Sequence, residues 1–357
     1  MTQDNHGFRD NPLVSVVICN LNGRKYLQRC LTSLRFQTYR NIEVIVVDNN
    51  STDYSVDFII REFPHVRIIR NNQNYGFAKA NNIGISVSRG VYLATLNNDT
   101  EVEPGWLGYL VAVMERDLDI GMCASKILLF NHRESIDSAA MLIYPDGLAL
   151  CRGHLKEDIF NYNKEEEVLL PTACAALYRK EAVLKAGLFD EDYFAYGEDI
   201  DLGLRISMLG YKCIHVPRAR VYHFYSGTSG ENFFMKAYLS ERNRIFTVIK
   251  CCSFVEILLS FLYTLSRYLH YIYAFLKKKG VSADFLEREP LYAVFIILLK
   301  VYICVIINMP RLLRKRYDIG YRRGMRYINI YMMRREFKIE ARELALKRRI
   351  YTILAKK

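Results

Sequence analysis

The sequence predicts an α/β fold in which a mostly parallel, Rossmann-like central sheet with flanking helices is followed by a C-terminal α-helical region. Two observations predict the sheet. Strand-like and helix-like segments alternate over roughly the first 100 residues, and the strand-like segments are continuous apolar runs, as expected of strands buried on both faces. The third observation is a change near residue 232 to long apolar helices and then a basic tail. We therefore divide the chain into a domain of residues 1–231 and a helical region of residues 232–357.

The elements follow one another in a regular order in the first part of the chain. Apolar runs rich in β-branched residues predict strands at 13–19, 42–48, 66–70 and 91–97. Helical periodicity predicts helices through 26–34, through 58–60 and over 78–88. The middle of the chain is less regular. There we expect a strand at 121–130, a strand turning into a helix within 172–187, a helix ending at Gly210 and an extended segment at 211–223.

Polar residues collect where the predicted strands end. Asn20 follows the first strand, Asp48 ends the second, and Asn98 and Asp99 follow the fourth. Ligands of open parallel sheets bind beyond the carboxyl ends of the strands, so we expect these side chains to share one site. Asp48 suits a hydrogen bond to the base or ribose of a nucleotide, whereas the Ser-Thr-Asp sequence shortly after it is typical of helix caps.

Metal and acid–base chemistry have candidates of their own. A carboxylate at a strand end, as at Asp99, suits Mg²⁺, which takes few protein ligands and completes its shell with phosphate oxygens and water; a plain turn is the alternative. Glu198, Asp199 and Asp201 open a helix, where the dipole favours acids. Three acids are more than the helix dipole accounts for, and one of them could be a general base. His223 could complete the shell begun by Asp99, while the other histidines are expected to be structural.

Six stretches of the chain together resemble the rhamnosyltransferase-like branch of glycosyltransferase family 2, whose catalytic domain has the GT-A fold. They are VSVVICNLNGRKYL, QTYRNIEVIVVDNNSTD, NQNYGFAKANNIGI, YLATLNNDTEVEPGWL, GLFDEDYFAYGEDIDLGLR and VYHFYSGTSG, and they cover about residues 13–230 in the family's order. The resemblance implies an inverting, metal-dependent hexosyltransferase. It would move one sugar, with rhamnose favoured, from a dTDP- or UDP-sugar to a hydroxyl of a lipid-linked or cell-surface glycan precursor.

The resemblance also implies roles for single residues. Asp199 would be the catalytic base with Glu198 beside it, and Trp106 and Asp201 would contact the acceptor. Asp99 and His223 would bind the divalent metal, Mg²⁺ or Mn²⁺. The donor would be bound by Asn20, Asn22, Asp48, Asn74, Gly76, Asn81, Asn82 and Asn98. The metal motif departs from the family, since it reads Asn-Asn-Asp where Asn-Pro-Asp or Asp-x-Asp is usual. Only one certain anionic metal ligand is left.

Other classes of protein fit the sequence less well. A nicotinamide dehydrogenase needs a glycine-rich turn after the first strand, and Asn20-Leu21-Asn22-Gly23 is not one. A processive polysaccharide synthase of the same family would carry Gln-x-x-Arg-Trp, and the single tryptophan lies in another setting. Nine cysteines without a CxxC motif argue for reduced thiols in the cytosol and against a zinc–thiolate site. A membrane-attached, catalytically inactive scaffold with the same fold stays as the alternative.

The C-terminal region has the composition of a membrane-associating segment. Residues 257–276 form an apolar helix with one narrow polar stripe, and residues 291–309 form an apolar run interrupted only by Lys300. The net charge of +12 comes from the tail that begins at Pro310. Basic residues on both flanks argue against a single span and favour an in-plane or shallow hairpin attachment at the cytoplasmic face of the cell membrane. A packed helical bundle is the alternative. Nucleic acid is not expected as a partner, because the tail lacks a folded basic face with stacking aromatics.

Overall fold

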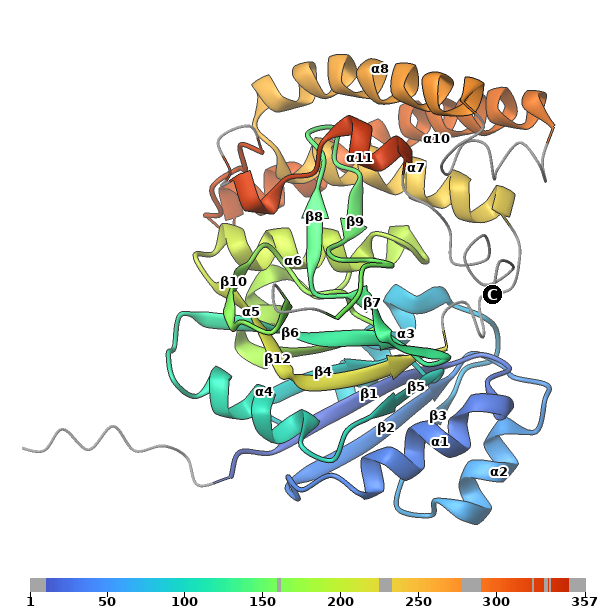
Figure 1. Cartoon of the computed structure of the whole chain (residues 1–357), viewed down its shortest axis with the longest axis vertical. Coiled ribbons are helices and arrows are strands. Elements are labelled where there is room, and N and C mark those ends of the chain that lie inside the picture. The colour runs from blue at the N-terminus through green and yellow to red at the C-terminus, as the bar shows by residue number, and fades with distance from the viewer. Residues whose placement is uncertain are drawn as a thin grey trace, which may run out of the picture.

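The computed structural model describes residues 11–158, 162–224, 233–277, 290–322, 324–330, 333 and 335–346. Within these ranges a central sheet carries helices on both faces, and a further layer of helices lies at one end of the molecule (Figure 1). The predicted boundary between residues 231 and 232 and the end of the basic tail lie outside the described residues. The division into two domains therefore stays a prediction.

The main sheet has ten strands, eight of them in the order β10-β12-β6-β11-β4-β1-β2-β3, with β5 paired to β12 and β7 paired to β6. The strands β8 and β9 form a separate hairpin. The bounds are β1 (Val14–Asn20), β2 (Ile42–Asp48), β3 (Arg67–Arg70), β4 (Tyr92–Leu96), β5 (Thr100–Val102), β6 (Ile120–Leu129), β7 (His132–Ser138), β8 (Met141–Ile143), β9 (Ala149–Cys151), β10 (Glu166–Val168), β11 (Ala175–Arg179) and β12 (Lys212–His223).

Two sets of helices sandwich the sheet. The bounds are α1 (Arg24–Arg35), α2 (Ser55–Glu62), α3 (Gly76–Val87), α4 (Trp106–Met114), α5 (Lys180–Ala186), the 3₁₀ turn η2 (Glu191–Tyr193) and α6 (Glu198–Met208). Helices α1, α2 and α4 pack on one face, and α3, α5 and α6 on the other. Along β1, the Val16 side chain packs on the face covered by α1, α2 and α4, and the next side chain, Val17, packs on the face covered by α3, α5 and α6. This alternation explains why the parallel strands are nearly continuous apolar runs.

The predicted α/β fold is confirmed, and its first half matches the sequence closely. The strands β4, β1, β2 and β3 pair in parallel, with Asn20 opposite Asp48. The second half is mixed, because β11 runs antiparallel between β4 and β6. The short strands β5, β7, β8, β9 and β10 were not predicted. They are three to seven residues long, and their pairing is decided by partners distant in sequence.

The C-terminal elements form the layer at the top of Figure 1. They are α7 (Phe233–Cys251), α8 (Phe254–Leu276), α10 (Leu291–Tyr317), the π turn η3 (Asp318–Arg322), the 3₁₀ turn η4 (Arg335–Phe337) and α11 (Ala341–Leu346). The β8–β9 hairpin rises from the sheet layer toward them, and the Tyr144 hydroxyl donates to the Tyr263 carbonyl at 3.3 Å. Among the described helices, one, spanning Tyr292–Tyr321, is long and apolar enough to cross a membrane, and only 22% of its apolar window is buried.

Candidate active site

At the carboxyl ends of β4, β1 and β2, a chain of hydrogen bonds joins the polar residues that the sequence predicted to meet. The Asn98 amide donates to Asn20 at 2.8 Å, and the Asn20 amide donates to Asp48 at 2.8 Å. Ser51, just after β2, donates to the Asp48 carboxylate from its backbone N–H at 2.9 Å and from its hydroxyl at 2.6 Å. The Asp48 carboxylate is therefore held in one orientation at the sheet edge where ligands of parallel sheets bind.

The loops around this edge are fixed by three more of the predicted residues. Asn22 accepts a hydrogen bond from the Thr52 N–H at 2.8 Å, which ties the loop after β1 to the loop after β2. Asn74 accepts from the Gly76 N–H at 2.9 Å. Gly76 opens α3 with φ of +80°, and a Cβ there would lie 2.5 Å from the Phe194 carbonyl oxygen. Glycine thus lets the segment before α6 reach the start of α3 and the sheet edge.

A second group of side chains lies beside the pair of β5 and β12. The Nε2 atom of His223 is 3.4 Å from Asp99 Oδ1, and its Nδ1 atom is 2.7 Å from Asp137 Oδ2. Asp137, on β7, is buried and also lies 3.1 Å from His154. Burial by itself would lower the pKa of His223, but Cys174, Asp99 and Asp137 together raise it well above its ordinary range.

Sequence reasoning missed Asp137 and treated His154 as merely structural. Asp137 belongs to a strand of mixed polarity with no motif around it, HRESIDS. It reaches His223 only because β7 pairs with β6, which in turn pairs with β12. No local pattern carries that information, so the partner of a predicted ligand was visible only in the tertiary structure.

The residues of this group fit a divalent cation that a diphosphate helps to hold. Asp99 offers a carboxylate and His223 a ring nitrogen, and Asp137 orients the ring through its other nitrogen, as is usual for metal-binding histidines. Within the described ranges, no group of three or more His, Cys, Asp or Glu side chains could hold a metal on its own. A site with two protein ligands needs phosphate oxygens and water to complete it, and a nucleotide diphosphate supplies the former.

The acids at the start of α6 have the surroundings of a general base. Asp199 accepts hydrogen bonds from the N–H groups of Ala173 at 3.1 Å and Ile200 at 2.9 Å. Glu198 is 6% exposed, and no described residue bonds to its Oε2 atom. Burial and then the charge of Asp199 raise the pKa of Glu198 well above its usual range. Burial also raises the pKa of Asp199, against the hydrogen bonds that it accepts. Carboxyl groups with raised pKa suit proton abstraction near neutral pH.

Two consecutive residues connect the acids at the start of α6 with the candidate metal ligands, Asp99 and His223. Ala173 donates to Asp199, and the carbonyl of the next residue, Cys174, accepts a hydrogen bond from the Asn97 N–H at 2.8 Å, two residues before Asp99. Consecutive Cα atoms are about 3.8 Å apart. The turn before β11 therefore contacts both the candidate base and the strand end that carries Asp99, and a substrate bound over this turn would meet both.

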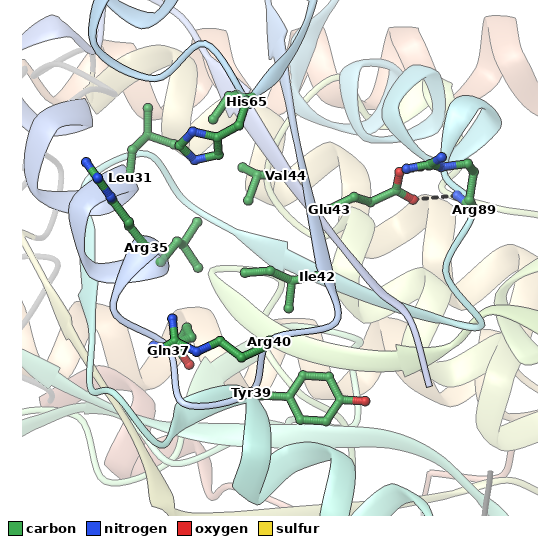
Figure 2. Close-up of a pocket in the computed structure, with 12 residues that line it drawn as sticks. Leu31, Arg35, Gln37, Tyr39, Arg40, Ile42, Glu43, Val44, His65 and Arg89 are labelled. Atoms are coloured by element: carbon green, nitrogen blue, oxygen red, sulfur yellow. Dashed lines mark hydrogen bonds and ion pairs between the residues drawn. The ribbon is translucent and has the colours of Figure 1, made fainter. Parts of the chain in front are cut away.

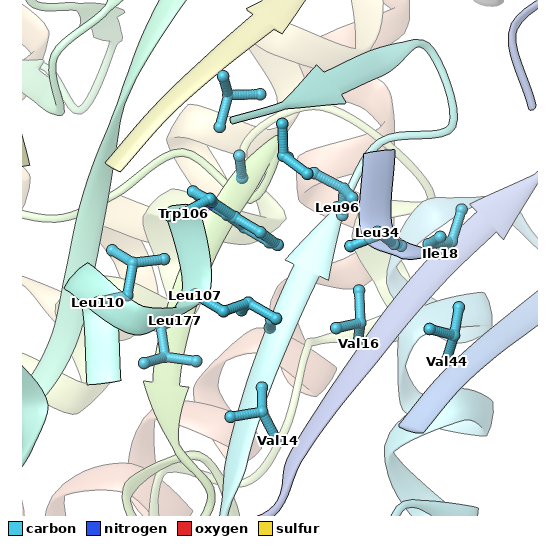
Figure 3. Close-up of a cluster of buried hydrophobic side chains, with 14 of the residues drawn as sticks. Val14, Val16, Ile18, Leu34, Val44, Leu96, Trp106, Leu107, Leu110 and Leu177 are labelled. Atoms are coloured by element: carbon cyan, nitrogen blue, oxygen red, sulfur yellow. The ribbon is translucent and has the colours of Figure 1, made fainter. Parts of the chain in front are cut away.

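Two predicted acceptor contacts are wrong. Trp106 is fully buried, its ring lies in the core between α4 and the sheet (Figure 3), and its indole N–H donates to Ser125 at 2.8 Å. Asp201 is also fully buried, and its carboxylate binds Arg205 at 2.6 Å and Lys250 at 2.7 Å. A buried indole and a buried ion pair cannot touch an acceptor without unpacking the core, so both side chains stabilise the fold.

Two predicted donor contacts also turn inward. The Asn82 amide donates to the Phe189 carbonyl at 2.9 Å and accepts from the Phe189 N–H at 3.0 Å. Asn81 donates to the Phe77 carbonyl one turn earlier in α3 and is 1% exposed. Direct donor contacts of this pair stay a prediction, since Asn20 and Asp48 of the candidate donor edge are buried to a similar degree. Asn82 fastens α3 to the segment that leads into α6.

A hollow of 460 Å³ lies at the opposite edge of the sheet (Figure 2). It is lined by α1, by the start of β2 and by His65 and Arg89. Its one acid, Glu43, is bound by Arg89 at 3.0 Å and by Ser15 at 2.5 Å. Because the hollow lies at the amino end of β2 and its acid is occupied, we place the candidate active site at the carboxyl edge.

The fold and this edge define a class, the GT-A fold of glycosyltransferases. GalNAc-T7, solved with UDP, GalNAc and Mn²⁺, superposes with a TM-score of 0.56 at 20% identity, over 69% of this chain and 49% of its own. The mannosyltransferase PcManGT from Pyrobaculum calidifontis, in complex with GDP-Man and Mn²⁺, superposes with a TM-score of 0.52 at 15% identity, over 87% and 86%. At such identities the likeness concerns the fold alone, and it confirms the predicted GT-A fold.

Residues 15–186 match the family named Glycosyl transferase family 2, so this part of the chain forms a domain of that family. An uncharacterized glycosyltransferase of Haemophilus influenzae is 28% identical over 56% of this chain and 61% of its own length. The N-acetylglucosaminyl-diphospho-decaprenol L-rhamnosyltransferase of Mycobacterium tuberculosis is 27% identical over 62% of this chain and 78% of its own. The matched region thus spans about three fifths of the Haemophilus protein.

Proposed function

We propose that the protein is an inverting, metal-dependent glycosyltransferase that moves one sugar from a nucleotide-diphosphate sugar to an acceptor hydroxyl. One observation carries the proposal: the turn of Ala173 and Cys174 is hydrogen-bonded both to Asp199 and to Asn97, at the strand end that carries Asp99, and Asp99 lies 3.4 Å from His223. A donor sugar bound over this turn would have its leaving diphosphate beside Asp99 and His223 and the acceptor hydroxyl beside Asp199.

The donor would lie along the carboxyl ends of β1, β2 and β4. Asp48, held by Asn20 and Ser51, would accept hydrogen bonds from the base or ribose. Asp99 and His223 would hold the divalent cation, Mg²⁺ or Mn²⁺, with Asp137 fixing the imidazole. A cation bound there would supply Lewis-acid stabilisation of the departing diphosphate.

Asp199 would act as the base. Its carboxylate takes the proton of the acceptor hydroxyl while that oxygen attacks the anomeric carbon from the face opposite the diphosphate. A single displacement of this kind inverts the configuration, and no covalent bond between sugar and enzyme is formed. Glu198, adjacent and with a raised pKa, would orient the acceptor and keep the local environment weakly charged.

The sugar and the acceptor are proposed by analogy. The mycobacterial relative is named for the transfer of L-rhamnose to a diphospho-decaprenol acceptor, which supports rhamnose from a dTDP-sugar and a lipid-linked or cell-surface glycan precursor as acceptor. A UDP-sugar is the second choice. An acceptor anchored in lipid places the reaction at a membrane, and the reduced cysteines favour its cytoplasmic face.

A thermal-shift screen tests the proposal most directly. The full chain is melted with dTDP-, UDP- and GDP-sugars, each with and without Mg²⁺ or Mn²⁺, and donor hydrolysis is followed in parallel. One nucleotide is expected to stabilise the protein only when metal is present, by about 2.7 kcal/mol at 100 times its Kd. Binding without any hydrolysis or transfer would favour the inactive scaffold, an alternative that the Asn-Asn-Asp metal motif supports. No shift with any donor would contradict the transferase itself.

A further inference from the structure

The helix α8 has its polar and apolar faces reversed relative to a helix on the surface of a soluble protein. Eleven large hydrophobic side chains are exposed along it, among them Phe261 at 66% and Leu276 at 72%. Its buried positions instead include Glu256, Thr264 and Arg267. In water the apolar face of such a helix would turn inward. The reversal indicates that the outer surface of α8 meets a medium that is not water.

The inward face of α8 is held by buried charges as well as by apolar contacts of Ile257, Tyr263 and Tyr271. Arg267 binds Asp146 at 2.6 Å and Glu241 at 2.9 Å, and Thr264 donates to Asp146 at 3.3 Å. Asp146 lies in the turn between β8 and β9, while Glu241 belongs to α7. Because these partners lie in two separate elements, α8 cannot rotate to hide its apolar face without breaking all three contacts.

The helix α10 also exposes a large apolar face. One stripe of α10, Ile297, Val301 and Val305, packs into the cluster that contains Phe246 of α7. The rest of its apolar half is exposed, with Phe295 at 68% and Ile307 at 71%. Figure 1 shows α8 as the outermost helix of this layer and α10 close to α7, on which it packs.

The charges of the two helices indicate which apolar medium this is. Glu256 is the single acid in α8 and α10, and it is buried, while Lys300, Arg311 and Arg314 are exposed along α10. An apolar surface whose exposed charges, on these two helices, are cations is complementary to the interface of an anionic bilayer. A second copy of the chain would bring like charges together.

We infer that the exposed face of α8 and α10 is a docking surface that lies in the plane of an anionic membrane. A span by α10 is disfavoured, because its inner stripe packs on α7 and Lys315, near its end, binds Asp190 at 2.5 Å. In-plane docking places both helices at one depth, about 5–10 Å into the boundary of headgroups and acyl chains. The inference rests on the proposed function only for the lipid-linked acceptor, and it can be tested without any donor.

Vesicle flotation of the full chain tests whether the surface binds lipid. The wild-type protein is expected to float with phosphatidylglycerol vesicles and less with phosphatidylcholine ones. Leu262→Glu combined with Leu265→Glu should reduce the bound fraction at least tenfold. The matched control, Leu118→Glu with Leu184→Glu, changes leucines that are equally exposed on the catalytic part and should leave it unchanged. Circular dichroism checks that both variants fold.

Bromine-labelled lipids test the orientation. One additional tryptophan at a time is introduced, by Phe261→Trp, Phe295→Trp or Ile307→Trp. The native Trp106 is fully buried and serves as an internal reference. Positions 295 and 307 are about 18 Å apart along a helix. In-plane docking predicts equal quenching by shallow bromines at all three sites, whereas a span predicts different depths at 295 and 307.

Three outcomes would overturn the inference. The first is wild-type protein that does not float. The second is a span-like depth profile. The third is a discrete dimer that binds no vesicles and that Leu262→Glu with Leu265→Glu dissociates, because the face would then be covered by a second copy. A positive donor shift with no flotation would leave the proposed sugar transfer intact, so the two failures are distinguishable.

Discussion

At the residue scale, the carboxylates of the candidate site differ from the buried carboxylates elsewhere in the kind of partner that holds them. Asp48 and Asp199 accept hydrogen bonds from neutral donors, mainly backbone N–H groups. Asp190 and Asp201, a few residues from the site, are bound by lysine and arginine. The hydrogen bonds of Asp48 and Asp199 leave both carboxylates without a cationic partner among these contacts, whereas Asp190 and Asp201 are paired with cations, and this distinguishes the two roles.

Asp199→Asn is expected to lower kcat by about 10²–10⁴-fold, because the amide cannot accept the acceptor proton. Donor binding should persist, since the contacts of Asp48 are untouched. Transfer kinetics and the donor-induced thermal shift measure the two effects separately. Glu181→Gln, an exposed acid on α5, is the control. Near-full turnover of Asp199→Asn would show that another group takes the proton.

The raised pKa values of Glu198 and Asp199 predict an acid limb in the rate profile. A base must be deprotonated, so kcat/KM should fall as the pH drops through an apparent pKa above the ordinary carboxyl value of 3.8. Because the two groups interact, that value belongs to the pair. The effect on stability has the opposite sign, since a folded state with raised carboxyl pKa gains stability as the pH falls. The rate is measured from about pH 4 to about pH 8, a range that brackets this fall. A kcat/KM that stays constant over this range would contradict the assignment of Asp199 as the base.

Asp137→Asn tests the site for the divalent cation. Loss of the carboxylate that orients a ligating histidine typically costs about 10–100-fold in metal affinity. We expect that loss in a Mn²⁺ titration followed by thermal shift in the presence of a nucleoside diphosphate. Asp117→Asn, an exposed acid near Lys212, should behave like the wild type. Unchanged Mn²⁺ affinity in Asp137→Asn would remove His223 from the proposed ligands.

At the element scale, the segment that leads into α6 is held by the C-terminal helices. Arg242 of α7 donates to the carbonyls of Asp192 and Tyr193 at 3.0 and 2.9 Å. Asn243 donates to the carbonyls of Ala195 and Tyr196 at 2.9 and 2.6 Å. The helical region is therefore part of what places the candidate base, although it was expected from the sequence to serve the membrane.

Lys315 of α10 provides the test at this scale. Its ammonium lies 2.5 Å from Asp190 and 2.6 Å from Asp192. Lys315→Met should lower kcat by about tenfold while the donor KM changes little, because a loosened segment misplaces Asp199 and leaves the donor edge intact. Lys315→Arg should restore most of the rate. Equal losses in both variants, or a loss confined to thermal stability, would contradict a positioning role.

At the scale of the whole molecule, buried charges join the hairpin β8–β9, α7 and α8. Neighbouring Arg244 and Arg267 hold the pKa of Glu241 far below its usual range, although burial opposes this. Removing one partner of a buried ion pair leaves the other charge uncompensated, which costs about 3–5 kcal/mol. The layer at the top of Figure 1 is thus fixed to the sheet layer by a few strong contacts.

Arg267→Met is therefore expected to lower the free energy of unfolding by about 3–5 kcal/mol, because Asp146 and Glu241 lose one of the two arginines that they share. Urea unfolding of the full chain in detergent measures it. Arg314→Met, at an exposed position of α10, should change stability by less than about 0.5 kcal/mol. A small effect of Arg267→Met would mean that α8 is held mainly by other contacts.

The sequence by itself determined the parallel half of the sheet and the polar edge at its carboxyl ends. Continuous apolar runs, each closed by Asn or Asp, specify where a strand stops, and strand order then brings Asn20, Asp48 and Asn98 together. The pair of Asp99 and His223 was also expected from the sequence, through the family resemblance, and the structure places the two side chains 3.4 Å apart.

Only the tertiary structure decided which polar or aromatic residues point inward. Trp106 and Asp201 occupy positions that match the pattern of the site, but both side chains are fully buried, and the Asn81 and Asn82 amides bind carbonyl oxygens of the protein. Burial depends on neighbours far away in the chain, and a local pattern does not contain them. For the same reason Asp137 was missed, and the polar stripe of α8 was recognised without its inward direction. Sequence periodicity defines the two faces of a helix, whereas the charged partners in β8–β9 and α7 decide which face turns outward.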